Sequence, residues 1–225
     1  MRGELRCNMR YSCVIFDCDG TLVDKREDIA AAMSQALTLH GFPSVPLENM
    51  EAMMGRGIKK FAHLALPEEA RTEQNVQTVA TDAQRIYFEN PLVKSKPYPG
   101  IAEMIAQMKT KKIKTAVLSN KPEEVLHRVT GSLFAPGSFD VVRGGLSEHG
   151  QKPDPSFVWE LLVDIDRSPR DTIFAGDSET DMETARSAGC CPLGISWGFR
   201  TREELEAAGA AYVIDSPKEI WEIIR

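Results

Sequence analysis

The sequence lacks the features that mark several large classes of protein. It has no apolar run long enough to span a bilayer, no internal repeat and no low-complexity segment. Lysine and arginine form no block and the net charge is −6 at pH 7, which argues against nucleic acid or an anionic membrane as the main partner. Neither G-x-x-x-x-G-K-[ST] nor a G-x-G-x-x-G after a strand is present, which disfavours a nucleotide-binding module. A small anionic substrate would then need a local positive site.

Cysteines are few, and their spacing suggests neither zinc nor a disulfide framework. The five cysteines stand at positions 7, 13, 18, 190 and 191, an odd number without a C-x-x-C pair or a Cys/His cluster. We interpret them as reduced thiols. The opening residues are basic but contain only a four-residue apolar run before Asp17, too short for the core of a signal peptide. We therefore expect a cytoplasmic protein.

Short apolar runs alternate with helical patterns over most of the 225 residues. The helical patterns show apolar residues at i, i+3, i+4 and i+7, as in Ile101, Met104, Ile105 and Met108. Strands that alternate with helices predict an α/β fold with a doubly wound, mainly parallel sheet. The predicted strands cover residues 11–16, 115–118, 139–142, 172–175, 192–195 and 212–214.

One interval interrupts this alternation directly after the first strand. From about Lys25 to Val93 the sequence shows helical stripes and no convincing strand. The return segment "KSKPYPG" holds two prolines and a glycine, which suits a semi-rigid hinge. We therefore expect an α/β core of residues 1–24 and 96–225, with residues 25–95 inserted as an all-helical cap.

The stretch "VIFDCDGTL" contains two acids that packing does not explain. Asp17 and Asp19 follow a buried apolar strand at once, where two carboxylates repel each other and lose hydration. In an open parallel sheet, ligands bind beyond the carboxyl ends of the strands. We therefore expect a cation or a basic side chain nearby that compensates for the two charges.

Other predicted strand ends carry complementary polar groups. Any one of these residues could merely cap a helix, form a turn or lie in solvent. Together with the loop of Asp17 and Asp19 they make four loops with complementary chemistry, which favours a common site over four independent caps. The residues are Ser119 and Asn120, then Asp177, Ser178 and Asp181, and finally Lys152 in "QKPDPS".

Four motifs in this order resemble the haloacid dehalogenase-like hydrolases that carry a helical cap after the first strand. "DCDGT" is similar to the family's D-x-D-G-T loop, "LSN" to its second motif, "KPDP" to its lysine motif and "GDSETD" to its G-D-x-x-x-D loop. The resemblance covers nearly the whole chain. Members that cleave carbon–halogen bonds lack an acid at the position of Asp19, so the resemblance implies a phosphate-transferring member.

The resemblance also implies a role for each residue. Asp17 would be the nucleophile that forms an aspartyl phosphate, and the Asp19 side chain would be the general acid and base. Asp17, Asp177 and the backbone carbonyl of Asp19 would hold Mg²⁺, and Asp181 would orient water bound to it. Ser119, Asn120 and Lys152 would bind substrate. Lys121 is a second candidate for the phosphate, although Lys152 alone is followed by the expected proline.

The expected substrate is a small phosphorylated metabolite bound by a monomer or homodimer. In the predicted cap, "MMGRGIKKF" offers Arg56 between two glycines, with Lys59 after it, as substrate-binding candidates or as solvated basic residues. Cap length, this loop and "SNKP" look most like phosphoglycolate phosphatases. The alternatives are a β-phosphoglucomutase-like phosphomutase, a pyrophosphatase, or a sugar or nucleotide phosphatase. A receiver-like module phosphorylated on aspartate represents a different class, but such modules lack the helical insertion.

Overall fold

Six parallel strands form the central sheet of the chain, in the order β5-β4-β1-β6-β7-β8. The computed structural model describes residues 11–51, 53–54, 57–145 and 151–224. All six predicted strands are present, with bounds that differ from the prediction by a few residues, so the doubly wound parallel fold is confirmed. The strands are β1 (Cys13–Phe16), β4 (Lys114–Pro122), β5 (Val141–Gly145), β6 (Thr172–Gly176), β7 (Cys191–Ile195) and β8 (Tyr212–Ile214).

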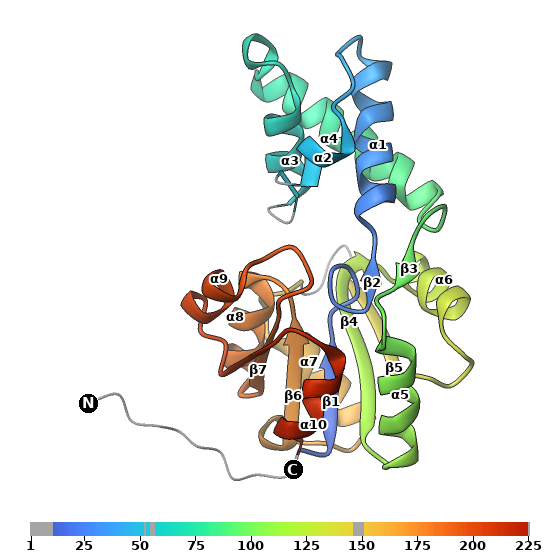
Figure 1. Cartoon of the computed structure of the whole chain (residues 1–225), viewed down its shortest axis with the longest axis vertical. Coiled ribbons are helices and arrows are strands. Elements are labelled where there is room, and N and C mark those ends of the chain that lie inside the picture. The colour runs from blue at the N-terminus through green and yellow to red at the C-terminus, as the bar shows by residue number, and fades with distance from the viewer. Residues whose placement is uncertain (1–10, 52, 55–56, 146–150, 225) are drawn as a thin grey trace.

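Helices cover both faces of this sheet because successive strand residues point to opposite sides. On one face Val14 and Phe16 pack with α5 (Ile101–Thr110), α6 (Glu123–Leu133) and α10 (Ile220–Ile223). On the other face Cys13 and Ile15 pack with α7 (Ser156–Asp164) and α8 (Glu179–Ala188). The remaining helix, α9 (Arg202–Ala207), lies against β7 and β8. The result is a three-layer α/β unit (Figure 1).

The segment between β1 and β4 contains a helical group with a hydrophobic core of its own. Its helices are α1 (Arg26–Leu39), α2 (Leu47–Glu51), α3 (Ile58–Ala65) and α4 (Glu73–Glu89). Apolar side chains from all four helices pack into one cluster that is separate from the two clusters of the sheet. Figure 1 shows this group standing beyond one end of the sheet.

Two chain crossings join the helical group to the sheet and are tied to each other. The short strands β2 (Val23–Asp24) and β3 (Lys96–Pro97) pair antiparallel. In the first turn of α1, the Asp28 carboxylate accepts hydrogen bonds from the backbone N–H groups of Lys94 and Ser95 at 2.8 and 2.9 Å. The sequence did not predict β2 or β3, because two-residue strands carry no periodic pattern.

Two further expectations have outcomes in the described part of the chain. Cys13, Cys18, Cys190 and Cys191 are free thiols, while Cys7 lies outside the described residues. Within the described ranges, every helix is too short or too polar to cross a membrane.

Candidate active site

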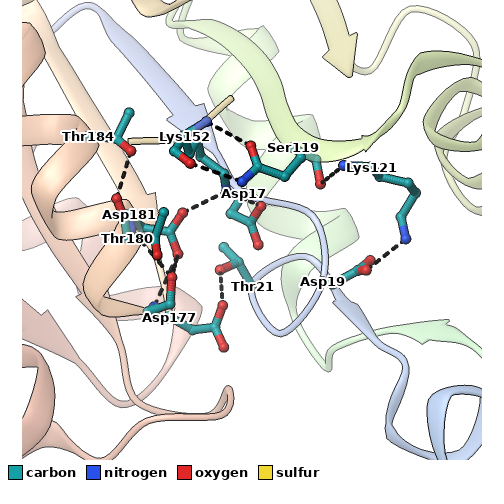
Figure 2. A network of polar contacts seen from close by, with 12 residues as sticks. Asp17, Asp19, Thr21, Ser119, Lys121, Lys152, Asp177, Thr180, Asp181 and Thr184 are labelled. Carbon is teal, nitrogen blue, oxygen red and sulfur yellow. Dashed lines mark hydrogen bonds and ion pairs between the residues drawn. The ribbon is translucent and has the colours of Figure 1, made fainter. Parts of the chain in front are cut away.

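The strand register brings the predicted site residues to one edge of the sheet. Phe16 at the end of β1 lies opposite Val117 of β4 on one side and Ala175 of β6 on the other. Asp17 follows Phe16 directly, and Ser119 and Asp177 lie two residues beyond the aligned positions of the neighbouring strands. Parallel strands end together, so these three side chains meet at the same edge. Figure 2 shows them facing a common space with Lys152 and Asp181.

Lys152 connects two of the carboxylates. Its Nζ donates to Asp17 Oδ1 at 2.5 Å and to Asp181 Oδ1 at 2.7 Å. The lysine side chain is only 6% exposed, so these charged contacts are almost free of screening by solvent. Asn120 fixes the lysine's backbone, since its Oδ1 accepts from Lys152 N–H at 2.7 Å and its Nδ2 donates to Lys152 O at 3.1 Å.

Asp181 caps a helix and faces the site at the same time. Ser178 is the N-cap of α8, and its side chain and the Asp181 side chain form a reciprocal capping box. Asp181 Oδ2 accepts from Ser178 Oγ at 2.6 Å, which leaves Oδ1 for Lys152. Capping and a place in the site are therefore compatible for this residue, because each uses a different carboxylate oxygen.

Asp177 lies where the backbone comes unusually close. Thr21 Oγ1 donates to Asp177 Oδ1 at 3.2 Å, and the N–H of Phe199 donates to Oδ2 at 2.8 Å. A Cβ at Gly20 would lie 2.2 Å from the Asp177 carboxylate, and a Cβ at Gly198 would lie 2.4 Å from it. Gly20 also has φ +85°, a conformation that favours glycine. Both glycines therefore leave the space that this carboxylate occupies.

Three carboxylates at this edge form an oxygen cluster suited to a divalent cation. Asp17, Asp177 and Asp181 are buried, and one oxygen from each lies within 4.8 Å of the others. Mg²⁺ prefers oxygen ligands, and a buried cluster of three acids with one lysine is short of positive charge. The residues present fit a hard divalent ion. Asp181 belongs to this cluster, whereas the sequence analysis expected it to orient water bound to the metal.

Burial and the neighbouring charges raise the pKa of two acids of the cluster, Asp17 and Asp177. Burial has the largest effect on the pKa of Asp17, and it outweighs the Lys152 ammonium, which favours the ionised form. The pKa of Asp17 is therefore raised to about 7. Burial and then the neighbouring Asp17 and Asp181 raise the pKa of Asp177 well above its usual value. Burial alone would lower the pKa of Lys152, but the two carboxylates outweigh it and raise that pKa. The acids therefore repel one another in the absence of a cation.

Asp19 occupies a different environment two residues away. Lys121 Nζ donates to Asp19 Oδ2 at 2.7 Å and to the hydroxyl of Tyr87 at 2.8 Å. Burial raises the pKa of Asp19, but the ammonium groups of Lys121 and Lys25 outweigh it and hold the pKa below the usual value. Lys121 thus contacts the second acid of the opening motif, while Lys152 contacts the first.

Ser119 and Asn120 lie at the end of β4 beside these lysines. Ser119 is buried and its Oγ accepts a weak hydrogen bond from the Lys121 N–H at 3.4 Å. Asn120 is exposed and binds the backbone of Lys152, as described above. Both residues line the same cavity as Asp17 and Asp19.

A cavity of about 350 Å³ opens between the sheet edge and the helical group. Asp17, Asp19, Ser119, Lys152 and Asp177 lie on the sheet side. Its other side is mostly apolar and comes from α1, α3, α4 and the loop after β7, with Ile29, Met54, Ile58, Phe61, Ala83, Phe88 and Phe199 among the lining residues. Lys59 is exposed and is not among the lining residues, and Arg56 lies outside the described residues.

The sequence analysis assigned no polar role to two contributors to the site. Tyr87 belongs to α4 and reaches the sheet edge through its hydroxyl, 34 positions from Lys121. Phe199 contributes a backbone N–H to Asp177 and packs its ring against the apolar cluster of the helical group. Tyr87 sits next to the helical stripe that ends at Ile86, which gave no sign of a polar role, and a backbone donor carries no side-chain signal at all.

Comparisons with known proteins agree with the four motifs. A family model described as haloacid dehalogenase-like hydrolase matches residues 14–195. A phosphoglycolate phosphatase of Aquifex aeolicus is 32% identical over 83% of this chain and 85% of its own length. A phosphoglycolate phosphatase of Haemophilus influenzae is 28% identical over 96% of this chain and all of its own.

Comparison with solved structures finds a similar fold in the same family. A solved structure from Lactobacillus delbrueckii subsp. bulgaricus superposes with a TM-score of 0.85 at 29% identity and covers 96% of this chain and 99% of that one. Family membership removes the receiver-like alternative. The chain therefore belongs to the haloacid dehalogenase-like hydrolase family, and within that family it is similar to the phosphatases.

Proposed function

We propose that the chain is a Mg²⁺-dependent phosphatase that hydrolyses a small phosphate monoester, phosphoglycolate, through an aspartyl phosphate on Asp17. The observation that carries this proposal is the contact of one buried lysine with both Asp17 and Asp181, beside Asp177. This edge offers a nucleophilic carboxylate, a cation for phosphate oxygens and an oxygen cluster for a metal. The names of the relatives support phosphoglycolate as the substrate.

The phosphoryl group would be bound by groups that already converge. Asp17 attacks phosphorus, and Lys152 Nζ and the Ser119 hydroxyl hold phosphate oxygens. Asp17, Asp177 and the backbone carbonyl of Asp19 would hold Mg²⁺, with Asp181 close enough to join them or to orient water. When bound, Mg²⁺ supplies the positive charge that allows an anionic carboxylate to approach an anionic phosphate.

The Asp19 carboxyl would handle the protons of both steps. It gives its proton to the alkoxide oxygen as that oxygen leaves phosphorus. It then takes a proton from the water that attacks the aspartyl phosphate, so the proton that it gave is replaced within the turnover. Because Lys121 and Lys25 favour the ionised carboxylate in the substrate-free site, Asp19 would take up this proton only when a phosphate ester is bound. A single residue can serve both steps because the leaving oxygen and the attacking water occupy the same side of the phosphorus.

The helical group would restrict which leaving groups reach this site. We propose that residues 25–95 form an inserted cap domain, since the paired crossings β2 and β3 bracket a segment with its own apolar core. The aromatic and aliphatic wall of the cavity comes largely from this segment. Arg56 stays a prediction as a substrate-binding residue.

The experiment is a panel of phosphate monoesters assayed for released phosphate with Mg²⁺, Ca²⁺ or chelator. We expect phosphoglycolate to have the highest kcat/KM, with loss of activity in chelator and a strong decrease with Ca²⁺, whose looser coordination misplaces Asp17. Equal rates with Ca²⁺ and Mg²⁺ would contradict the metal site. Conversion of a hexose 1-phosphate to its 6-phosphate, without release of phosphate, would instead establish the phosphomutase alternative.

A further inference from the structure

The cavity offers an anionic leaving group one cation, in addition to the one at the phosphate end. Among the described residues that line it, the basic side chains are Lys152 and Lys121. Lys152 is committed to Asp17 and Asp181 at the sheet edge. Lys121 lies beyond Asp19, on the side from which the leaving group departs in the mechanism proposed above. A negative charge on the leaving group would therefore meet Lys121.

Lys121 and Tyr87 have hydrogen-bonding capacity left for a ligand. A lysine ammonium has three donors, and the contacts of Lys121 Nζ with Asp19 Oδ2 and the Tyr87 hydroxyl use two of them. The Tyr87 hydroxyl lies 3.4 Å from Asp19 Oδ2, which is long for an O–H···O hydrogen bond. Its proton is thus weakly engaged, and both groups can donate to a further oxygen without losing a strong contact.

Two lysine ammonium groups lie beside the Tyr87 ring. Lys121 Nζ lies 4.4 Å from the ring centroid and Lys25 Nζ lies 5.4 Å from it. Lys25 is fully buried and donates to the carbonyl of Pro91, a neutral partner. Within the described parts of the chain, no carboxylate forms an ion pair with Lys25, and Asp19 is the one that pairs with Lys121. The charges of Asp19 and Asp28 act on Tyr87 as well, so a substrate carboxylate would be held by the third donor of Lys121 rather than by an excess of positive charge.

The rest of the described cavity wall offers a carboxylate no further cation, because its other polar side chains are neutral or acidic. The side chains of Ile58, Phe61, Phe88 and Phe199 are apolar, so an anion placed against them would lose hydration without compensation. In phosphoglycolate a single methylene separates the carboxylate from the bridging oxygen that Asp19 would protonate. The carboxylate must therefore lie close to Asp19, where Lys121 and Tyr87 stand.

We propose that Lys121 and the Tyr87 hydroxyl form the subsite for the carboxylate of the substrate. They would thereby set the preference for phosphorylated 2-hydroxy acids over phosphate esters whose alcohol part is uncharged. This inference rests on the proposed phosphatase function. It assigns the specificity to a strand-end lysine of the sheet and a tyrosine of the helical group, two elements that the substrate bridges.

The test compares two substrates that differ only at the proposed subsite. Phosphoglycolate and 2-hydroxyethyl phosphate share a skeleton, but the second carries a neutral CH₂OH in place of the carboxylate. Each is assayed with the wild type, Lys121→Met, Lys121→Arg and Tyr87→Phe, and kcat and KM are determined separately. Lys109→Met is the matched control, because it removes one positive charge at an exposed position where Nζ contacts only the carbonyl of Gly137.

We expect the wild type to prefer phosphoglycolate. Lys121→Met should lower the ratio of the two kcat/KM values about 30-fold or more, mainly through KM for phosphoglycolate, as for one lost partner of a desolvated charge pair. Tyr87→Phe should lower the ratio about 10-fold or more, the scale of one hydrogen bond to a charged group. Lys121→Arg should restore part of the preference, and Lys109→Met should leave the ratio unchanged.

The two proposals fail in different ways. If the wild type does not favour phosphoglycolate, the proposed substrate is wrong and the carboxylate subsite falls with it. If the wild type favours phosphoglycolate but Lys121→Met slows both esters equally, Lys121 only supports Asp19 and the subsite is overturned. A preference that survives in Lys121→Met and disappears in Arg56→Ala would place the carboxylate on Arg56 instead. Thermal unfolding of each variant checks that the buried substitutions leave the fold intact.

Discussion

Asp17 and Asp19 lie two residues apart, and each carboxylate has a lysine Nζ within 2.7 Å. Their environments nevertheless shift the pKa of the two carboxyls in opposite directions. Around Asp17 burial, with the neighbouring acids, outweighs the one lysine and raises the pKa of this carboxyl to about 7. Around Asp19 two lysines outweigh burial and lower its pKa. The contrast shows that burial and the balance of all nearby charges, and not the presence of one salt bridge, set the pKa of a buried acid.

The two pairs also differ in where their parts come from. Asp17 and Lys152 lie in loops beside the strand ends, and Asp181 lies in the first turn of α8, so the geometry of this group does not depend on the helical group. The Asp19–Lys121 pair is completed by Tyr87 of α4. The Asp17–Lys152 pair is thus suited to a reaction step that many substrates share. The Asp19–Lys121 pair is suited to discriminating between substrates.

The largest expected effect concerns the lysine of the first pair. Lys152→Met should lower kcat/KM for every phosphate ester by about 10³-fold or more. The phosphate oxygens would lose a cation that binds them, and the three buried acids would lose the lysine that offsets their charge. The loss should be equal for phosphoglycolate and 2-hydroxyethyl phosphate, unlike that in Lys121→Met. Kinetics on both esters measures this difference, and a selective loss in Lys152→Met would erase the contrast between the two lysines.

A smaller effect should appear in the stability of the metal-free protein. Since the folded state raises the pKa of Asp17 from 3.8 to about 7, it binds the proton more tightly than the unfolded chain, and stability should fall as pH rises between those values. Asp177, whose pKa is also raised, acts in the same direction. Mg²⁺ binds the ionised acids, so its stabilising effect should be larger at pH 8 than at pH 5.5.

Melting temperatures measured across this pH range, with Mg²⁺ and with chelator, would test that prediction. We expect a difference of a few degrees between the two pH values, and a weaker pH dependence in Asp177→Asn, which removes one acid of the cluster. A Mg²⁺ effect that is the same at both pH values would show that the cluster is not where the ion binds.

Much of the site could be predicted from the sequence because its residues follow buried parallel strands. Such strands appear as apolar runs, and the residue after each run lies at the edge where ligands bind. The division of work between Lys121 and Lys152 could not be predicted, since it depends on where two long side chains point. Tyr87 could not be predicted either, because its role follows from how α4 packs against the sheet.

The smallest expected effect separates the two roles of Ser178. Ser178→Ala removes the capping side chain of α8 and should cost about 1 kcal/mol of stability. Thr201→Ala is the matched control, because it breaks the equivalent capping box of α9, away from the cavity. Both variants should lose similar stability in chemical denaturation. Only Ser178→Ala should also weaken Mg²⁺ activation, since Ser178 Oγ holds Asp181; equal Mg²⁺ activation in both variants would count against a role for Asp181 at the metal.

The central claim, that Asp17 is the nucleophile and Asp19 the proton carrier, is tested most directly by a rapid-mixing assay with p-nitrophenyl phosphate. The nitrophenolate group of this ester leaves without protonation, so Asp19→Asn should release about one equivalent of nitrophenol in a burst. Hydrolysis of the aspartyl phosphate should then be slower by about 10²- to 10⁴-fold, because the attacking water lacks its base. Asp17→Asn should give neither burst nor turnover. A burst from Asp17→Asn and none from Asp19→Asn would contradict the account.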